Sequence, residues 1–298
     1  MKWQLQLARS AVKRALPFKP TLRRLKRSIS SYPPDISNLD TTLEDAFTLI
    51  RVLRGTGRTV KDRTVLEIGS GWFPVIPIIY AVLGARRVIL TDLQRYMDDG
   101  TFRAARDYLM MNAPRVAENL EISPARIAAI LNGSTTQADL AFDYIVPFDP
   151  GRLELLDLVD VISSRAVLEH VPQADLCALL PLWARLLSHE GVMMHAIDMS
   201  DHFEHGDKSI SRINYLRFSR VSWRLINAVG DHQNRLRHSD FMAMFAAAGL
   251  HVLALETRTD PQALDDAAQL ELASPFNRMA PDDIAILTSY VILEPAQR

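Results

Sequence analysis

Two apolar segments, each associated with an acidic residue, constrain the fold of this chain more than any other feature. The first has Glu67 near its end and is followed by Gly69 and Gly71. The second, residues 87–91, is followed directly by Asp92. In a parallel sheet, such glycines let the backbone approach a ligand, and a carboxylate at the next strand end binds ribose hydroxyls. The pair therefore predicts a parallel α/β sheet with a nucleoside site at its carboxyl edge.

Short apolar runs alternate with helical patterns along the chain, which is typical of a doubly wound α/β sheet. Seven strands are expected, at residues 65–68, 87–91, 127–131, 160–163, 191–197, 251–256 and 284–292. Helices are expected at residues 41–55, 97–112, 173–188 and 239–248. We predict a Rossmann-like, seven-stranded doubly wound sheet formed by residues 38–298. Residues 200–237 match neither pattern and are predicted to be a substrate-binding insertion after the fifth strand.

Composition and charge exclude several classes of protein. With 48% hydrophobic and 23% charged residues, the 298-residue chain is expected to be globular. Its single cysteine, Cys177, rules out an internal disulfide framework and favours a reducing, cytoplasmic compartment. Nine of the 34 Lys and Arg residues lie in the first thirty positions, which hold no acid, so 25 face 35 acidic residues downstream. An acidic body argues against a nucleic-acid partner.

The basic N-terminal arm, residues 1–37 with its linker, needs a separate explanation. Its first part has the pattern of an amphipathic helix, and Pro17 and Pro20 interrupt that pattern. Three interpretations stay open: a helix in peripheral contact with an anionic membrane surface, a structural arm packed on the domain, or an organellar transit peptide. No stretch of the sequence approaches the roughly 18 apolar residues of a membrane-spanning helix.

The residues around the two glycines indicate which nucleoside is bound. A dinucleotide site requires a third glycine, but Gly69 and Gly71 are followed by Trp72, Phe73 and Pro74. Glu67 would repel a pyrophosphate, whereas it can accept hydrogen bonds from an ammonium group. S-adenosylmethionine carries an ammonium and a sulfonium and has no phosphate.

The chain resembles the class I S-adenosylmethionine-dependent methyltransferases at several motifs. Residues 67–71 match the start of the family's E/D-x-G-x-G-x-G motif, although Phe73 replaces the last glycine. Residues 160–172 (DVISSRAVLEHVP) and 191–198 (GVMMHAID) resemble its fourth and fifth strands, and residues 143–148 resemble the third-strand loop more loosely.

This resemblance implies S-adenosyl-L-methionine as the cofactor and assigns residues to it. Glu67 is expected at the amino-acid end, the alternative being a carboxylate that caps the next helix. Asp92 is expected to bind the ribose hydroxyls. The full set of expected cofactor-binding residues is Glu67, Gly69, Ser70, Gly71, Asp92, Leu93, Ser164 and Arg165.

Ionisable residues that follow the fourth and fifth strands are candidates for the chemistry. His170 follows the fourth strand and could act as a base or simply pack beside the cofactor. Asp198, Asp201, His202 and His205 follow the fifth strand, where a base with an orienting carboxylate, a divalent metal site and a solvated loop are all open. We assign His170, Asp198 and His202 as catalytic and assign no metal ligand.

Aromatic, arginine and asparagine side chains in the insertion suit a polar, ring-bearing acceptor, or could form the insertion's own small core. The expected substrate contacts are Arg212, Tyr215, Trp223, Asn234 and Arg235. The wider pattern resembles bacterial methyltransferases associated with surface-polysaccharide assembly. We therefore predict O-methylation of a sugar in a glycan or glycolipid. The alternatives are a methyltransferase acting on a small aromatic or lipid-like metabolite, and a non-catalytic cofactor-binding scaffold.

Overall fold

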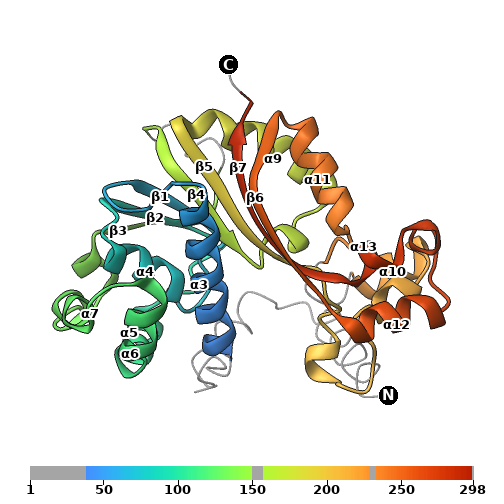
Figure 1. Ribbon diagram of the computed structural model, residues 1–298, viewed down its shortest axis with the longest axis horizontal. Helices are drawn as coiled ribbons and strands as arrows, with labels where there is room; N and C mark the ends of the chain where they lie inside the picture. The colour runs from blue at the N-terminus through green and yellow to red at the C-terminus, as the bar shows by residue number, and fades with distance from the viewer. Residues whose placement is uncertain (1–37, 150–156, 228–232, 297–298) are drawn as a thin grey trace, which may run out of the picture.

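A seven-stranded sheet forms the centre of the computed structural model, which describes residues 38–149, 157–227 and 233–296 (Figure 1). Its strand order is β3-β2-β1-β4-β5-β7-β6. The first five strands in this order are parallel, and β7 runs antiparallel to both of its neighbours. The strands are β1 Thr64–Ile68, β2 Arg87–Thr91, β3 Phe142–Ile145, β4 Val159–Arg165, β5 Leu187–Asp198, β6 Leu250–Thr259 and β7 Ile286–Pro295. The predicted Rossmann-like sheet is confirmed, whereas the arm at 1–37 lies outside the described residues.

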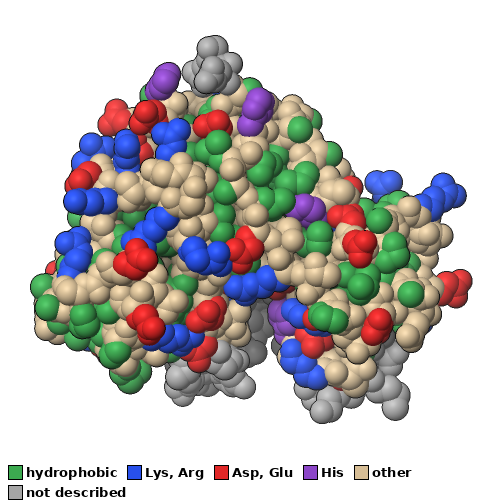
Figure 2. All heavy atoms as spheres, in the orientation of Figure 1, with side chains coloured by type: hydrophobic (Ala, Val, Ile, Leu, Met, Phe, Trp, Pro, Cys, Tyr) green, Lys and Arg blue, Asp and Glu red, His purple; other side chains and the backbone are tan. Residues whose placement is uncertain are grey.

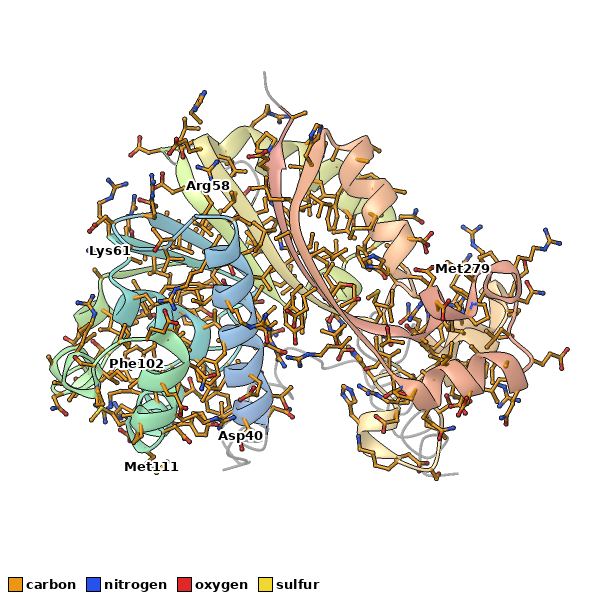
Figure 3. All side chains as sticks on the ribbon, in the orientation of Figure 1. Asp40, Arg58, Lys61, Phe102, Met111 and Met279 are labelled. Carbon is orange, nitrogen blue, oxygen red and sulfur yellow. The ribbon has the colours of Figure 1, made fainter. Side chains whose placement is uncertain are left out.

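Helices cover both faces of the sheet because successive strand residues point to opposite sides. On β1, Val65 belongs to one hydrophobic core and Leu66 to the other. The first core is covered by α3 Leu39–Gly55, α4 Val75–Leu83, α5 Asp99–Met111, α6 Ala113–Leu120 and α7 Pro124–Leu131. The second is covered by α9 Gln173–Leu186 and α11 His238–Ala247. Figure 3 shows Phe102 of α5, which is fully buried, among the side chains of the first group.

A third hydrophobic cluster forms a small lobe beside the far edge of the sheet. Its first part follows β5 and comprises η4 Glu204–Gly206, η5 Asn214–Arg217 and α10 Arg220–Asn227. Its second part lies between β6 and β7 and comprises α12 Pro261–Gln269, η6 Phe276–Arg278 and α13 Pro281–Ala285. Tyr215 and Trp223 from the first part pack with Phe276 and Ile284 from the second. Met279, labelled in Figure 3, marks the position of this lobe.

The prediction of a strand at residues 127–131 is wrong, because these residues end helix α7. Ser123 caps that helix by accepting a hydrogen bond from the Arg126 amide, and Pro124 occupies its first turn. Ile127 and Leu131 are the buried positions, one helical turn apart. The third strand is β3, which begins at Phe142.

Several predicted boundaries also shift. The helix expected at 97–112 begins at Asp99, because Asp98 forms a capping box with Thr101. The strand expected at 284–292 begins two residues later, since α13 occupies its start. β5 begins at Leu187, earlier than expected, and pairs there with Val159. Among the described residues, none of the helices is long and apolar enough to cross a membrane.

Candidate active site

The turn after β1 rests on the end of β2 and on the turn after β4. The backbone amides of Gly69 and Ser70 both donate to the carbonyl of Thr91, at 2.8 and 3.1 Å. Gly69 has φ +73°, and a Cβ there would lie 2.4 Å from a methyl group of Val167. Only glycine fits this position, because both the backbone conformation and the contact exclude a side chain.

Asp92, which directly follows β2, stabilises the same turn. Its two carboxylate oxygens accept hydrogen bonds from the amides of Gly71, at 2.8 Å, and Leu93, at 2.7 Å. Burial raises the pKa of Asp92, while the two amides act in the opposite direction. Each oxygen retains a lone pair, so the carboxylate can still accept hydrogen bonds from ligand hydroxyls.

Glu67 lies on the face of β1 that α4 covers. Its side chain is almost completely buried and receives hydrogen bonds from the hydroxyls of Tyr80 and Ser163, which lie 2.6 Å from each other. Burial outweighs these bonds and raises the pKa of Glu67 to about 8. The carboxyl is therefore largely protonated at neutral pH unless a cationic group approaches it.

Three buried polar atoms near these strand ends lack a hydrogen-bond partner among the described residues: Glu67 Oε2, Ser70 Oγ and Thr91 Oγ1. Close by, Leu93 is 76% exposed although it is apolar, and the ring of Trp72 lies 5.2 Å from that of Tyr96. A ligand that combines hydroxyls, a cationic end and a flat base matches this mixture of acceptors and apolar surface. These residues therefore fit S-adenosylmethionine.

Two expected cofactor residues are directed elsewhere. Ser164 is fully buried within β4, and its hydroxyl lies 2.8 Å from Nδ1 of His195 on β5. Arg165 donates from Nε to Asp45 of α3 at 2.8 Å, and the same carboxylate accepts a bond from the Tyr290 hydroxyl. Both side chains thus join elements of the fold.

The three residues assigned as catalytic lie together at the carboxyl ends of β4 and β5, where Asp198 is the last residue of β5. The rings of His170 and His202 are 4.9 Å apart, and the ring of His205 is 5.1 Å from that of His202. Asp198 Oδ2 lies 3.7 Å from His202 Nε2 and 4.0 Å from His205 Nε2. The nearby histidines and the bonds from Ser200 lower the pKa of Asp198 despite its burial. Figure 2 shows the lower edge of the molecule hollowed between its two ends, with His, Lys and Arg side chains gathered there.

Glu169 belongs to this group although the sequence did not single it out. It lies in η3 Leu168–His170, is 1% exposed, and accepts a 3.2 Å hydrogen bond from the amide of Asp198. Burial and the charge of Asp198 raise its pKa well above the ordinary value. Donor atoms of Glu169, His170 and His202 lie within 4.8 Å of one another, so these three side chains could hold a metal ion. The signals in the sequence were its place in the motif at residues 160–172 and its position next to His170.

Asp201 has a local role in the loop after β5. It is fully buried and accepts a hydrogen bond from the amide of Phe203 at 2.8 Å, which fixes the turn that carries His202. Burial raises its pKa to about 6.

The five expected substrate contacts mainly hold the lobe and its neighbouring loop together. Tyr215 and Trp223 are buried in the third cluster and donate to the carbonyls of Met199 and Gln233. Arg235 donates to the backbone carbonyls of Tyr215 and Phe218. Arg212 pairs with Asp260 at 2.8 Å, and Asn234 donates to two carbonyls of the turn after β4. Contact of these residues with an acceptor stays a prediction.

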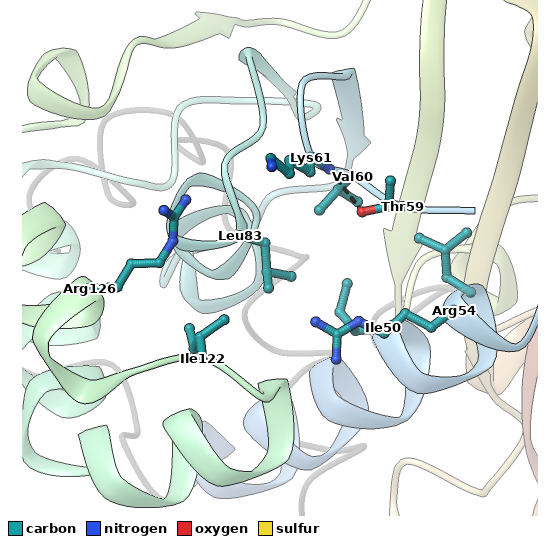
Figure 4. A pocket seen from close by; sticks show the side chains of 9 residues that line it. Ile50, Arg54, Thr59, Val60, Lys61, Leu83, Ile122 and Arg126 are labelled. Carbon is teal, nitrogen blue, oxygen red and sulfur yellow. Dashed lines mark hydrogen bonds between the residues drawn. The ribbon is translucent and has the colours of Figure 1, made fainter. Parts of the chain in front are cut away.

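A cavity of about 300 Å³ lies away from this edge of the sheet (Figure 4). It lies between α3, the loop at residues 59–61, the C-terminal end of α4 and the start of α7, and it opens to solvent. Apolar side chains such as Ile50, Leu83 and Ile122 line it together with Arg54 and Arg126. None of its lining residues belongs to the turn at residues 69–71 (the glycine turn) or to the group of Glu169, His170, Asp198, His202 and His205 (the histidine cluster). The cavity is therefore not part of the site.

A sequence family described as a methyltransferase domain matches residues 44–255. The chain belongs to this family. It is therefore an S-adenosylmethionine-dependent methyltransferase, as the motifs predicted. No curated protein matches the chain.

Several methyltransferases are among the solved structures with similar folds. Magnesium protoporphyrin IX methyltransferase from Synechocystis PCC 6803, with bound S-adenosylhomocysteine, is 12% identical, with 95% of this chain and 98% of that chain covered and a TM-score of 0.47. An S-adenosylmethionine-dependent methyltransferase from Mesorhizobium loti is 18% identical, with 82% and 95% covered and a TM-score of 0.42.

Proposed function

We propose that this methyltransferase transfers a methyl group to a hydroxyl oxygen, and that the acceptor is a sugar in a glycan or glycolipid. The observation that carries the proposal is the cluster of His170, Asp198 and His202 beside the glycine turn. Val167 contacts Gly69 only three residues before His170. This contact supports a position of the cluster close to the bound cofactor.

Within the site, we assign the cofactor to the ends of β1 and β2. Asp92 binds the ribose hydroxyls through its remaining lone pairs, and the turn at residues 69–71 covers the methionine portion. Leu93 offers an apolar surface to the adenine, and Glu67 accepts hydrogen bonds from the ammonium group, directly or through water. The unpartnered acceptors Glu67 Oε2 and Ser70 Oγ support this orientation.

S-adenosylmethionine, when bound, supplies a methyl group on a sulfonium that is ready for in-line displacement. The protein aligns the acceptor hydroxyl with this methyl group and removes its proton. As the new O–CH₃ bond forms, the S–CH₃ bond breaks with its electron pair on sulfur. The hydroxyl proton passes to an imidazole of His170 or His202, and Asp198 stabilises the imidazolium of His202. The products are the methyl ether, S-adenosylhomocysteine and a proton on the protein.

The polarity of the cluster favours a sugar over the alternatives. Two carboxylates and three imidazoles at one sheet edge offer many hydrogen-bonding partners to a polyol and little apolar surface to a lipid-like metabolite. The resemblance to methyltransferases of surface-polysaccharide assembly agrees with this choice. A non-catalytic scaffold would have no need for histidines gathered beside the methyl group.

The test separates cofactor binding from chemistry. Calorimetry should show binding of S-adenosylmethionine but not of NAD, and Asp92→Ala should weaken that binding roughly tenfold or more, since each charge-assisted hydrogen bond contributes about 1.5–3 kcal/mol. Release of S-adenosylhomocysteine should be measured with a panel of glycosides and a panel of phenols.

Substitutions in the cluster should affect the release of S-adenosylhomocysteine but not the binding of S-adenosylmethionine. His170→Ala and His202→Ala should lower turnover with glycosides by about 10²–10⁴-fold and leave the affinity for S-adenosylmethionine nearly unchanged. His189→Ala, which removes an exposed histidine at the start of β5, is the matched control. Normal turnover in both cluster variants, or turnover with phenols alone, would contradict the proposal.

A further inference from the structure

The donors in the histidine cluster come from two turns that follow neighbouring strands. Glu169 and His170 lie in η3, after β4, and His202 lies in the loop after β5. One nitrogen from each imidazole and one oxygen from the carboxylate lie within 4.8 Å of one another. Metal–ligand bonds of about 2.0–2.2 Å place two ligands of one ion up to about 4 Å apart, so small rotations of the side chains would close the site.

The buried carboxylate of Glu169 is an independent sign that a cation belongs here. Oε1 accepts the hydrogen bond from the amide of Asp198, but Oε2 is buried and has no hydrogen-bond partner among residues 38–149, 157–227 and 233–296. A buried carboxyl oxygen without a partner is accommodated either by a proton or by a cation that it can coordinate. Its neighbours His170 and His202 place a ring nitrogen within 4.8 Å of it.

The turn that carries two of the donors is fixed in place. The side-chain amide of Asn234 donates to the carbonyls of Leu168 and Val171, both at 2.8 Å, and its backbone amide donates to the carbonyl of Glu169. Beside His202, Asp198 is itself held by a 2.9 Å hydrogen bond from the amide of Ser200. Such outer partners orient metal ligands in proteins.

We propose that Glu169, His170 and His202 bind a divalent transition-metal cation. Two imidazoles and one carboxylate favour first-row transition metals, whereas Mg²⁺ and Ca²⁺ prefer oxygen donors. Three protein ligands leave coordination positions open. Once coordinated, neither imidazole can accept the acceptor proton, so in the metal-bound protein the cation would activate the acceptor hydroxyl in their place. This role rests on the proposed function, but binding of the cation does not.

Zinc binding to the full chain tests this proposal directly. The protein is stripped with a chelator, and Zn²⁺ is titrated by calorimetry without cofactor or acceptor. We expect one equivalent to bind. Glu169→Gln, which retains an acceptor for the Asp198 amide, and His202→Ala should each weaken the affinity roughly 100-fold. His189→Ala should bind like the wild type, and Mg²⁺ should not compete.

The outcomes that would overturn the proposal are specific. One is the absence of stoichiometric binding of both Zn²⁺ and Mn²⁺ to the wild type; another is equal Zn²⁺ affinity in Glu169→Gln, His202→Ala and the wild type. Thermal unfolding of each variant shows whether it is folded, and His202→Ala at a partly exposed position keeps the test open if Glu169→Gln is unstable. Stripped protein that binds S-adenosylmethionine but no Zn²⁺ would refute the metal site alone. Protein that binds Zn²⁺ but no S-adenosylmethionine would refute the proposed cofactor site alone.

Discussion

Gly69 packs against Val167 and so joins the turn after β1 to the turn after β4. Replacing Gly69 tests this contact. Gly69→Ala places a methyl group against Val167 and adds a side chain at φ +73°. Overpacking costs about 1–3 kcal/mol and the left-handed backbone about 1–2 kcal/mol more. Gly71→Ala is the matched control, because its φ of +65° carries the same strain while its Cβ would meet nothing within 4 Å.

Urea denaturation should therefore show a clearly larger loss of unfolding free energy in Gly69→Ala than in Gly71→Ala. Equal losses would mean that the turn after β4 can move away from the glycine turn at little cost. In that case the histidine cluster would not be held against the glycine turn. The proposed position of His170 beside the cofactor would then be wrong.

Position along a strand can be deduced from the sequence, but the direction of a side chain is harder to deduce. The structure brings Asp92 together with the glycine turn, and His170 together with Asp198 and His202, because parallel strands end at one edge. Ser164 and Arg165 lie within β4, where their partners His195 and Asp45 are distant in sequence. No local pattern identifies such partners. Glu169 was missed for the same reason.

At the level of elements, ambiguity arose where an apolar run was short. Residues 127–131 are long enough for a strand and for one helical turn, so periodicity alone could not decide between them. The cap at Ser123 and Pro124 was the better signal. β3 is only four residues long, and its second residue, Asp143, pairs with Arg87 at the exposed end of the sheet. Because the pattern of β3 is partly polar, the sequence did not indicate a strand there.

The lobe is assembled from two separate insertions, and the buried side chain of Arg237 joins them. Its guanidinium donates to the carbonyls of Met199, Ile284 and Ile286 and to the Tyr215 hydroxyl. Arg237→Met removes these hydrogen bonds and leaves three of the four groups without this donor, while the carbonyl of Met199 still accepts a bond from the Tyr215 hydroxyl. At about 1–3 kcal/mol for each unsatisfied group, the loss should exceed about 3 kcal/mol. Arg224→Met on exposed α10 is the control and should change stability by less than about 0.5 kcal/mol.

Chemical denaturation gives the loss, and amide hydrogen exchange locates it. Faster exchange in residues 213–226 and 261–285 together would show that the two insertions form one cooperative unit. If exchange rises in only one of the two segments, the lobe is not held together by Arg237.

For the whole molecule, the strand order explains why the two parts of the site meet. The chain order reverses between β1 and β4, and ligands bind where neighbouring connections of an open sheet diverge to opposite faces. The glycine turn and η3 follow these two strands. The next strand, β5, adds Asp198 and leads directly into the lobe. The sequence could predict this edge from the order of its motifs, whereas the lobe depends on contacts between residues far apart in the chain.

Two groups buried in this sheet should give the folded molecule opposing responses to pH. Burial lowers the pKa of His195 to about 3, so its contribution to stability is lost as the pH falls from 6.5 towards that value. Burial raises the pKa of Glu67 from 4.5 to about 8, so the folded state binds more protons than the unfolded state between these values. The contribution of Glu67 is therefore present at low pH and is lost as the pH rises.

Glu67→Gln isolates the second effect, because glutamine stays neutral. Between pH 5 and pH 8, the unfolding free energy of the wild type should fall relative to that of Glu67→Gln, with a slope approaching about 1.4 kcal/mol per pH unit. Urea denaturation of both proteins across this range measures the difference. Saturating S-adenosylmethionine should reduce the slope, since an ammonium near Glu67 stabilises the carboxylate. Parallel curves for the two proteins without cofactor would show that Glu67 is already ionised, and the buried carboxyl would then require a permanent cationic partner.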